Sequence, residues 1–417
     1  MQAEIFTGSN SGLIIGSYVA LNLLALFLLD HWLCNCSLKY RDSVTRRVIV
    51  CFLYISVASL PVLALFIRDG LYKYYLERYS YVWMGFLMYF GAFILVLSVL
   101  EVIIRLILRS KRKKQPDEEA ETGGTAGRVV SGIALLLIIA AAIAINIYGT
   151  EHARKTVVTR YNIEIEKPVK KHEALRVAFI SDLHLSYNSD IDNVYRMVET
   201  INREKPDVVF VGGDMFSSNY GSVMNPKEYI KAFKGIKAKE GVFWVYGNHD
   251  VQEPLFCGFS MVDPEKAKRT RKIKRFIKKS GFTTLDDKCT AIAGGEVQVA
   301  GRTDMYKPVG KAATRKEPGD LLNDLDKDKP IIVLAHEQGD FDELAENGAD
   351  ILFSGHTHAG QVFLGNIVTG LFNDILYGFA EKNGLKVIVS SGVGCYGPPI
   401  RVLTDSEIVI ADITFKK

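Results

Sequence analysis

The pattern of apolar and polar positions divides this chain into two parts. Four long apolar stretches, at 13–29, 48–67, 81–108 and 129–148, fill the first 150 residues. A helix needs about 20 residues to cross the hydrocarbon core of a bilayer. These stretches also lack the polar stripe that a helix of a soluble bundle shows. The pattern therefore predicts a membrane domain of four transmembrane helices over residues 1–150.

The second part has a different pattern of apolar residues, with short apolar runs at 177–180, 208–211, 242–245, 331–334 and 351–353. Short runs rich in β-branched residues suit buried central strands of a covered sheet. We therefore expect an α/β domain over residues 173–417, joined to the helices by a charged linker, residues 151–172. Within that linker the alternation at 161–166 indicates a first edge strand.

Polar residues follow each of the five predicted strands. The segments are Asp182-Leu183-His184, Gly213-Asp214, Gly247-Asn248-His249-Asp250, His336 and Gly355-His356-Thr357-His358, and they hold five of the chain's eight histidines. The ends of such strands converge on one edge, where α/β folds build their sites. A lone Asp after a strand is more often a cap or turn residue, but the five segments together favour a site for two divalent ions. Asp, Asn and His without cysteine suit Mn, Fe, Zn or similar ions.

The order D-x-H, G-D, G-N-H-D, H, G-H-x-H resembles the calcineurin-like metallophosphoesterase superfamily over roughly residues 175–413. The resemblance implies an α/β/β/α sandwich and a metal-dependent phosphoric ester hydrolase in which a hydroxide bridging two metals attacks phosphorus. It also implies the metal ligands: Asp182, His184 and His358 for the first ion, Asp214 as the bridge, and Asn248, His336 and His356 for the second. By the same resemblance His249 protonates the leaving oxygen and Asp250 orients its imidazole.

Two further segments narrow the resemblance. Residues 355–361 and 391–401 are similar to membrane-associated phosphodiesterases of the YaeI/YkuE type, which resemble UDP-2,3-diacylglucosamine hydrolases. The fused helices resemble the architecture of transmembrane proteins with a metallophosphoesterase domain. This implies a phosphate ester or pyrophosphate of a lipid or lipid-linked sugar as substrate. Arg302 and Arg401 are candidate phosphate contacts, because guanidinium binds phosphate bidentately; a structural or surface role is the alternative.

One departure from the family is the run His336-Glu337-Gln338, where many members carry a proline two residues after the histidine. It changes the expected shape of the loop, with Glu337 either near the site or facing solvent. Gly360 and Gln361 are expected to shape the neighbouring loop.

The distribution of charge along the chain indicates its membrane topology more clearly than its binding partners. The net charge of +4 is too small to indicate a nucleic-acid-binding protein on its own. Lys and Arg are most abundant in the first and third loops between the helices, so the positive-inside rule places these loops in the cytoplasm. We therefore expect a multi-pass protein of the inner cell membrane with an extracytoplasmic catalytic domain, although Arg154, Lys155 and Arg160 favour the opposite orientation. The lack of Lys or Arg before Lys39 argues against a signal peptide.

The segment 266–279 contains nine Lys or Arg and no acidic residue. Ile273, Phe276 and Ile277 have helical spacing, so one face is expected to dock on the domain. The basic face is either a solvated surface or a contact to anionic lipid headgroups. The six cysteines form neither a disulfide framework nor a zinc pattern.

Other classes of function remain open at this point. The chain could be a non-catalytic membrane receptor or scaffold that keeps the fold, or a nuclease or protein phosphatase of the same superfamily. A transporter is not supported, because the apolar stretches carry little charge beyond Glu101 and Arg105, which can pair at i and i+4.

Overall fold

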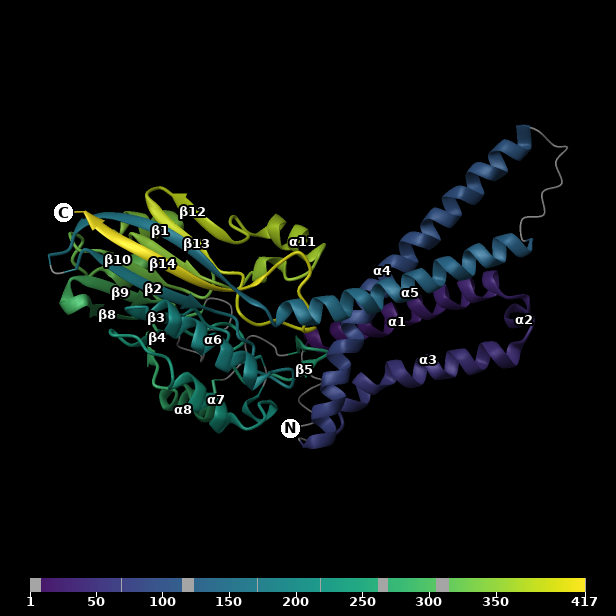
Figure 1. The fold of residues 1–417 in the computed structure, drawn as a ribbon, viewed down its shortest axis with the longest axis horizontal. Helices are drawn as coiled ribbons and strands as arrows, with labels where there is room; N and C mark the ends of the chain where they lie inside the picture. Colours follow the sequence, from purple (N-terminus) through teal and green to yellow (C-terminus); the bar gives the residue numbers. More distant parts are fainter. Residues whose placement is uncertain are drawn as a thin grey trace. The chain divides into compact units, whose positions relative to one another are not determined.

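The computed structural model describes residues 9–68, 70–114, 124–170, 172–217, 219–261, 269–304 and 315–416. The chain divides into a helical unit, Met1–Tyr148, and a catalytic unit, Gly149–Lys417. Figure 1 shows the long helices of the first unit and the strands and shorter helices of the second.

Among the described residues of the helical unit, four helices are long and apolar enough to cross a membrane. They are α1 (Ser9–Cys36), α3 (Val44–Ala64), α4 (Leu71–Lys114) and α5 (Thr125–Ala153), with the short α2 (Leu38–Arg41) after α1. This confirms the four predicted spans. At 1.5 Å per residue, the 44 residues of α4 extend about 66 Å, roughly twice the thickness of the hydrocarbon core. The ends of α4 therefore reach beyond the apolar layer, and both ends are polar in sequence. The expected Glu101–Arg105 pair is present, and His31 also contacts Glu101, at 2.9 Å.

The described part of the catalytic unit contains two six-stranded sheets and a small hairpin. In the first sheet the order is β1 (Thr156–Pro168), β14 (Ser406–Lys416), β2 (Ala174–Ile180), β3 (Val208–Val211), β4 (Val242–Trp244) and β7 (Thr283–Thr284). In the second it is β12 (Gly378–Lys382), β13 (Leu385–Val389), β11 (Ile351–Ser354), β10 (Ile331–Leu334), β9 (Val297–Gly301) and β8 (Lys288–Ile292). The hairpin is β5 (Leu255–Phe256) and β6 (Phe259–Ser260). The five strands expected before the polar segments are β2, β3, β4, β10 and β11, and in each sheet they run parallel to one another.

Side chains from alternate faces of the strands build three apolar layers. Between the sheets, Phe179 and Phe210 of the first pack against Phe353 of the second, with ring centroids 5.3 and 5.8 Å apart. The outer face of the first sheet is covered by α6 (Ile191–Glu204), α7 (Pro226–Phe233) and α8 (Arg271–Lys279), and that of the second by α9 (Pro318–Leu322) and α10 (Phe341–Glu346). The order helix, sheet, sheet, helix is the predicted α/β/β/α sandwich. One further helix, α11 (Gly365–Phe372), follows the last polar segment.

Most of the segment expected to be a linker, residues 151–172, is ordered as β1. This strand pairs parallel with β14 from Thr156 opposite Ser406 onward, at the edge of the first sheet. The edge strand predicted at 161–166 is therefore longer than expected, because the partner strand extends from 406 to 416. The connection between the last helix and the sheet is therefore shorter than the expected linker, because α5 ends at Ala153 and β1 begins at Thr156.

Residues 271–279 of the basic segment form α8, and the apolar stripe docks as predicted. Ile273, Phe276 and Ile277 are buried against the first sheet. Arg269 does not face outward: its side chain is 4% exposed, bonds Asp286 at 2.8 Å and stacks on Tyr246 at 4.0 Å. Lys266 and Lys268 lie outside the described residues.

Candidate metal centre

Both sheets contribute polar residues at the carboxyl ends of their central strands. Asp182 and His184 follow β2, Asp214 follows β3, and Asn248 follows β4. From the second sheet, His336 follows β10, and His356 and His358 follow β11. Parallel strands leave their last carbonyls and the next side chains at one edge. Because the sheets stack face to face, both edges open on the same space. The structure therefore brings all seven expected ligands together.

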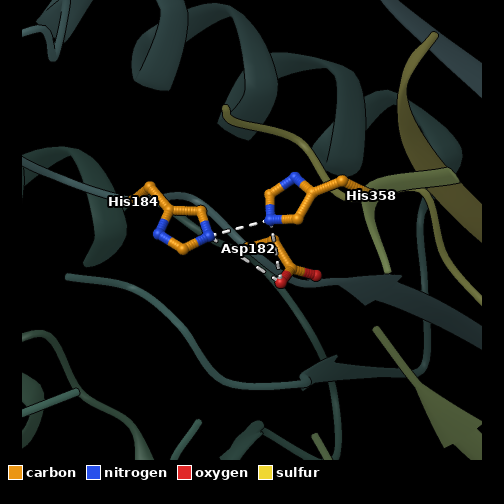
Figure 2. Close-up of side chains that lie close together, drawn as sticks. All are labelled: Asp182, His184 and His358. Atoms are coloured by element: carbon orange, nitrogen blue, oxygen red, sulfur yellow. Dashed lines mark hydrogen bonds and ion pairs between the residues drawn. The ribbon is translucent and has the colours of Figure 1, made fainter. Parts of the chain in front are cut away.

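The first group joins one carboxylate and two imidazoles (Figure 2). The Nε2 atoms of His184 and His358 lie 2.9 Å apart, and Oδ1 of Asp182 lies 3.9 and 3.4 Å from them. Ligand atoms about 2.0–2.1 Å from one ion lie about 3–3.5 Å from each other. Burial lowers the pKa of His184 to about 3, and burial also lowers the pKa of His358 well below its usual value. Neutral imidazoles with converging nitrogens fit a divalent cation.

The second group lies on the other side of Asp214. Nε2 of His336 is 3.1 Å from Oδ2 of Asp214, 3.3 Å from Nδ1 of His356 and 3.0 Å from Oδ1 of Asn248. Nδ1 of His336 contacts the carbonyl of Gly212 at 2.8 Å, which fixes the ring with Nε2 toward the centre. The donor set of carboxylate, amide oxygen and imidazoles fits a second divalent ion.

Asp214 connects the two groups. Its Oδ2 lies 3.1 Å from Nε2 of His336 and 3.8 Å from Nε2 of His184. Its Oδ1 accepts the backbone N–H of His249 at 2.7 Å, which holds the carboxylate in place. Burial alone would raise the pKa of Asp214, but the neighbouring His336 and His249 imidazoles hold that pKa well below its usual range. An ionised carboxylate between two ligand groups is the geometry of a bridging ligand.

The backbone at the centre is unusual. Asp182, His184, Asp214, His356 and His358 all have positive φ angles, between 51° and 73°. Side-chain-bearing residues rarely adopt this left-handed region, and such residues cluster at functional sites. A Cβ on Gly355 would lie 2.3 Å from Oδ2 of Asp182, so glycine is required there for the loop to approach the carboxylate.

The expected proton donor, His249, is held by a partner that sequence reasoning did not identify. Nδ1 of His249 lies 2.6 Å from Oε1 of Glu253, which is buried, and Ser260 donates its hydroxyl to the other oxygen of Glu253. The ring of Tyr396 packs against His249 with centroids 4.5 Å apart. His249 also lies beside the first group, with its ring 5.4 Å from that of His184.

Asp250 does not take the orienting role assigned to it from the family resemblance. Its two oxygens accept four backbone N–H groups, from Asp214, Met215, Phe216 and Gly247, at 2.8–3.1 Å. Burial, and next the charge of Asp214, raise the pKa of Asp250 to about 7. The side chain therefore fixes the loop that carries Asp214, while Glu253 contacts the imidazole.

Both candidate phosphate contacts have structural roles instead. Arg401 is fully buried, and its guanidinium donates to five backbone carbonyls, those of Ser391, Gly392, Gly394, Asp405 and the ligand residue His358, at 2.6–3.3 Å. Arg302 is 1% exposed and bonds Asp340 at 2.8 Å. Both guanidinium groups are buried and hydrogen-bonded within the domain, so neither is available to bind a phosphate that enters from solvent.

The loops that depart from the family pattern lie against the centre. Glu337 is buried, which excludes a solvent-facing position. Gln338 donates from its amide to the carbonyl of Ile375. The side chain of Gln361 bonds the backbone of Tyr396 through both N–H and C=O, at 2.8 and 2.9 Å. Gln361 thus shapes the site loop, as expected, by placing the ring that packs on His249.

Comparison with known proteins agrees with this geometry. Residues 175–360 match the calcineurin-like phosphoesterase family. A metallophosphoesterase of Aquifex aeolicus is 30% identical over 263 residues, which cover 62% of this chain and 92% of that protein. A Helicobacter pylori metallophosphoesterase is 29% identical over 248 residues, and the match covers 57% of this chain and 60% of that relative's length.

A relative whose name describes a transmembrane protein extends the match beyond the catalytic unit. It is a Danio rerio transmembrane protein with metallophosphoesterase domain, 27% identical over 390 residues, 89% of this chain and 82% of that protein. A match of that length includes helical residues of the N-terminal unit. The two Asp/His groups, the stacked sheets and these matches lead to one conclusion: this chain is a member of the calcineurin-like phosphoesterase family, with N-terminal helices that anchor it to a membrane.

Proposed function

We propose that this chain hydrolyses a phosphate ester or pyrophosphate bond of a lipid or lipid-linked sugar, using two divalent ions held by the seven ligands. The observation that carries the proposal is a pair of largely buried Asp/His groups, in each of which the ligand atoms lie within 4.8 Å of one another. Asp214 of the second group also lies 3.8 Å from His184 of the first. Two bound ions supply an activated water nucleophile and neutralise the charge of the phosphoryl oxygens.

The chain's own residues hold the reacting groups in position and supply a proton. His249 protonates the leaving oxygen from the ring nitrogen that Glu253 does not contact. A general acid of this kind contributes typically about 10²–10⁴-fold in rate. Glu253 and Tyr396 hold the ring beside the first ligand group, because Nδ1 is bonded and one ring face is covered. Asp250 keeps the Asp214 loop rigid through four backbone N–H groups.

Hydrolysis of the soluble diester bis-p-nitrophenyl phosphate by the full chain tests the chemistry. We expect turnover that requires added Mn²⁺, with Asp214→Asn losing both activity and bound metal by elemental analysis. His249→Ala should lose activity and keep its metal. Asp192→Asn, an exposed carboxylate in the first turn of α6, is the matched control. If the purified protein shows no metal-stimulated hydrolysis of mono- or diesters, the enzyme assignment fails and the receptor or scaffold alternative remains.

The lipid part of the proposal is supported by the four membrane-spanning helices and by the short connection from α5 to β1. A panel of phospholipids, lipid pyrophosphates and lipid-linked sugars presented in vesicles tests it by phosphate or headgroup release. Faster turnover of water-soluble esters than of every lipid in the panel would refute the lipid assignment and leave the phosphoesterase assignment intact.

We also propose that the catalytic unit faces away from the cytoplasm, since the first and third loops carry more Lys and Arg than the second. Fusing a reporter after residue 417 tests this. Activity of a reporter that works only in the cytoplasm would reverse the orientation.

A further inference from the structure

The helix α11 is an exposed apolar element in the catalytic unit. None of its described residues, Gly365–Phe372, is buried. Leu371 is 76% and Phe372 is 82% exposed, and their apolar neighbours are exposed by 47–54%. The α11 patch comprises Phe363, Leu364, Ile367, Val368, Leu371 and Phe372. Residues 359–373 contain no charged residue. Large apolar patches of this kind on a folded domain mark interaction surfaces.

Both ends of α11 are tied to loops that carry metal ligands. Before the helix, Gln361 donates its backbone N–H to the carbonyl of the ligand residue His358 at 2.9 Å. After the helix, Thr357, which lies between the ligands His356 and His358, donates to the carbonyl of Leu376 at 2.6 Å. The patch is therefore fixed at the rim of the metal centre by hydrogen bonds within the catalytic unit.

The same rim lies where the chain enters the catalytic unit from its last span. Gly149, in the last turns of α5, accepts the backbone N–H of Arg401 at 3.0 Å. The next residue, Val402, donates to the carbonyl of Gln361 at 3.2 Å, and Thr404 donates to the same carbonyl at 2.6 Å. A few hydrogen-bonded residues thus connect the point where α5 joins the domain to the start of α11.

We propose that the α11 patch is inserted into the boundary between headgroups and acyl chains of the bilayer that holds the helical unit, at the entrance to the metal centre. The occupant is a lipid surface, because the patch lacks charge and lies within a few residues of a membrane-spanning helix. Helices that lie on a bilayer surface bury their apolar face at the headgroup level. A lipid could then present its phosphate to the centre without leaving the membrane. The inference rests on the membrane anchoring in the proposed function and is independent of its chemistry.

Spin-label accessibility in the full chain tests the proposal. Leu371→Cys is labelled in a background with all six native cysteines replaced, and the protein is placed in nanodiscs of phosphatidylcholine and phosphatidylglycerol. Tyr195→Cys on α6, whose side chain is 39% exposed, is the matched control. We expect apolar oxygen to relax the label at 371 more than a water-soluble nickel chelate does, with the reverse order at 195.

A second measurement uses the unmodified chain, so that failure of the cysteine-free protein to fold does not decide the question. Phospholipids with a diazirine high in the acyl chain should form adducts on peptides covering 361–377 and not on those of α6 and α7. Equal nickel accessibility at 371 and 195 overturns the proposal. So does an absence of adducts on 361–377, or spin–spin broadening at 371 that disappears on dilution, which would assign the patch to a second copy of the chain. Neither readout involves hydrolysis, so this inference and the proposed function can fail separately.

Discussion

Replacing Asp250 by Asn tests whether this carboxylate fixes the Asp214 loop or orients the imidazole of His249. In the structure each carboxylate oxygen accepts two backbone N–H groups. The substitution turns one oxygen into an NH₂ group, which faces two N–H donors and loses two charge-assisted hydrogen bonds. Each such bond contributes about 1.5–3 kcal/mol, so the loop loses about 3–6 kcal/mol of local stability.

Amide hydrogen exchange measures this loss where it occurs. If residues 214–216 and 247 open about 3–6 kcal/mol more easily, their amides exchange about 10²- to 10⁴-fold faster. The experiment is done at pH 8, because the pKa of Asp250 is about 7 and the comparison requires the ionised form. Bound metal should fall in parallel, since Asp214 lies on the same loop.

Glu253→Gln is the matched comparison. Its Oε1 can still accept from Nδ1 of His249, and the amides of the Asp214 loop donate to Asp250, which this substitution leaves in place. Exchange at 214–216 should therefore remain unchanged while the rate of hydrolysis falls. If Asp250→Asn instead keeps its amide protection and its metal and loses only turnover, then Asp250 acts on the imidazole and the structural assignment is wrong.

Substitutions of Arg401, Gly355 and Tyr396 test individual contacts. Arg401→Met removes the donors to five backbone carbonyls and should cost more than about 4 kcal/mol, seen as a large fall in the unfolding temperature. An unchanged unfolding temperature with a raised KM would restore the phosphate-binding role. Gly355→Ala places a Cβ 2.3 Å from Oδ2 of Asp182 and should release metal, which elemental analysis measures. The control Gly319→Ala, whose Cβ would have its nearest neighbour at 3.7 Å, should keep its metal. Retained metal in both variants would contradict the tight fit at Gly355. Tyr396→Phe loses only the 2.8 Å bond from the backbone N–H of Ser260, so it should cost about 1 kcal/mol of stability and retain activity. Tyr396→Ala should lower kcat, because the ring that packs on His249 is gone. Equal kcat in the two variants would argue against a positioning role for the ring.

The strands, and the gathering of the seven candidate ligands at their ends, were predictable because the signals are local. Each ligand follows a short run of residues that can only be buried, and a polar side chain directly after such a run lies at the edge of a sheet. The docking face of α8 was predictable for the same reason, since Ile273, Phe276 and Ile277 repeat at helical spacing. The four spans follow from length and composition alone.

The errors arose where a residue's role depends on distant backbone. Glu253 is four residues after His249, but these residues form no regular helix, so the spacing carries no information. The charge of Arg401 suggests a phosphate, and only the folded loops show that carbonyls from residues 358 to 405 converge on it. The alternating segment at 161–166 gave no hint that its partner lies about 250 residues away, in β14.

The contact of Gly149 with Arg401 determines where this protein can be divided. The carbonyl of Gly149 accepts the N–H of Arg401, and a Cβ on Gly149 would lie 3.0 Å from Ile400 and 3.3 Å from Val402. The last turns of α5 thus cover the apolar side of the loop at 400–402, from which Arg401 donates to the carbonyl of His358. A soluble fragment for crystallisation or screening should begin before Gly149. A fragment that begins at residue 155, after α5, would strip that cover, expose Ile400 and Val402 to water, and yield a destabilised enzyme whose low activity would be mistaken for a lack of substrate.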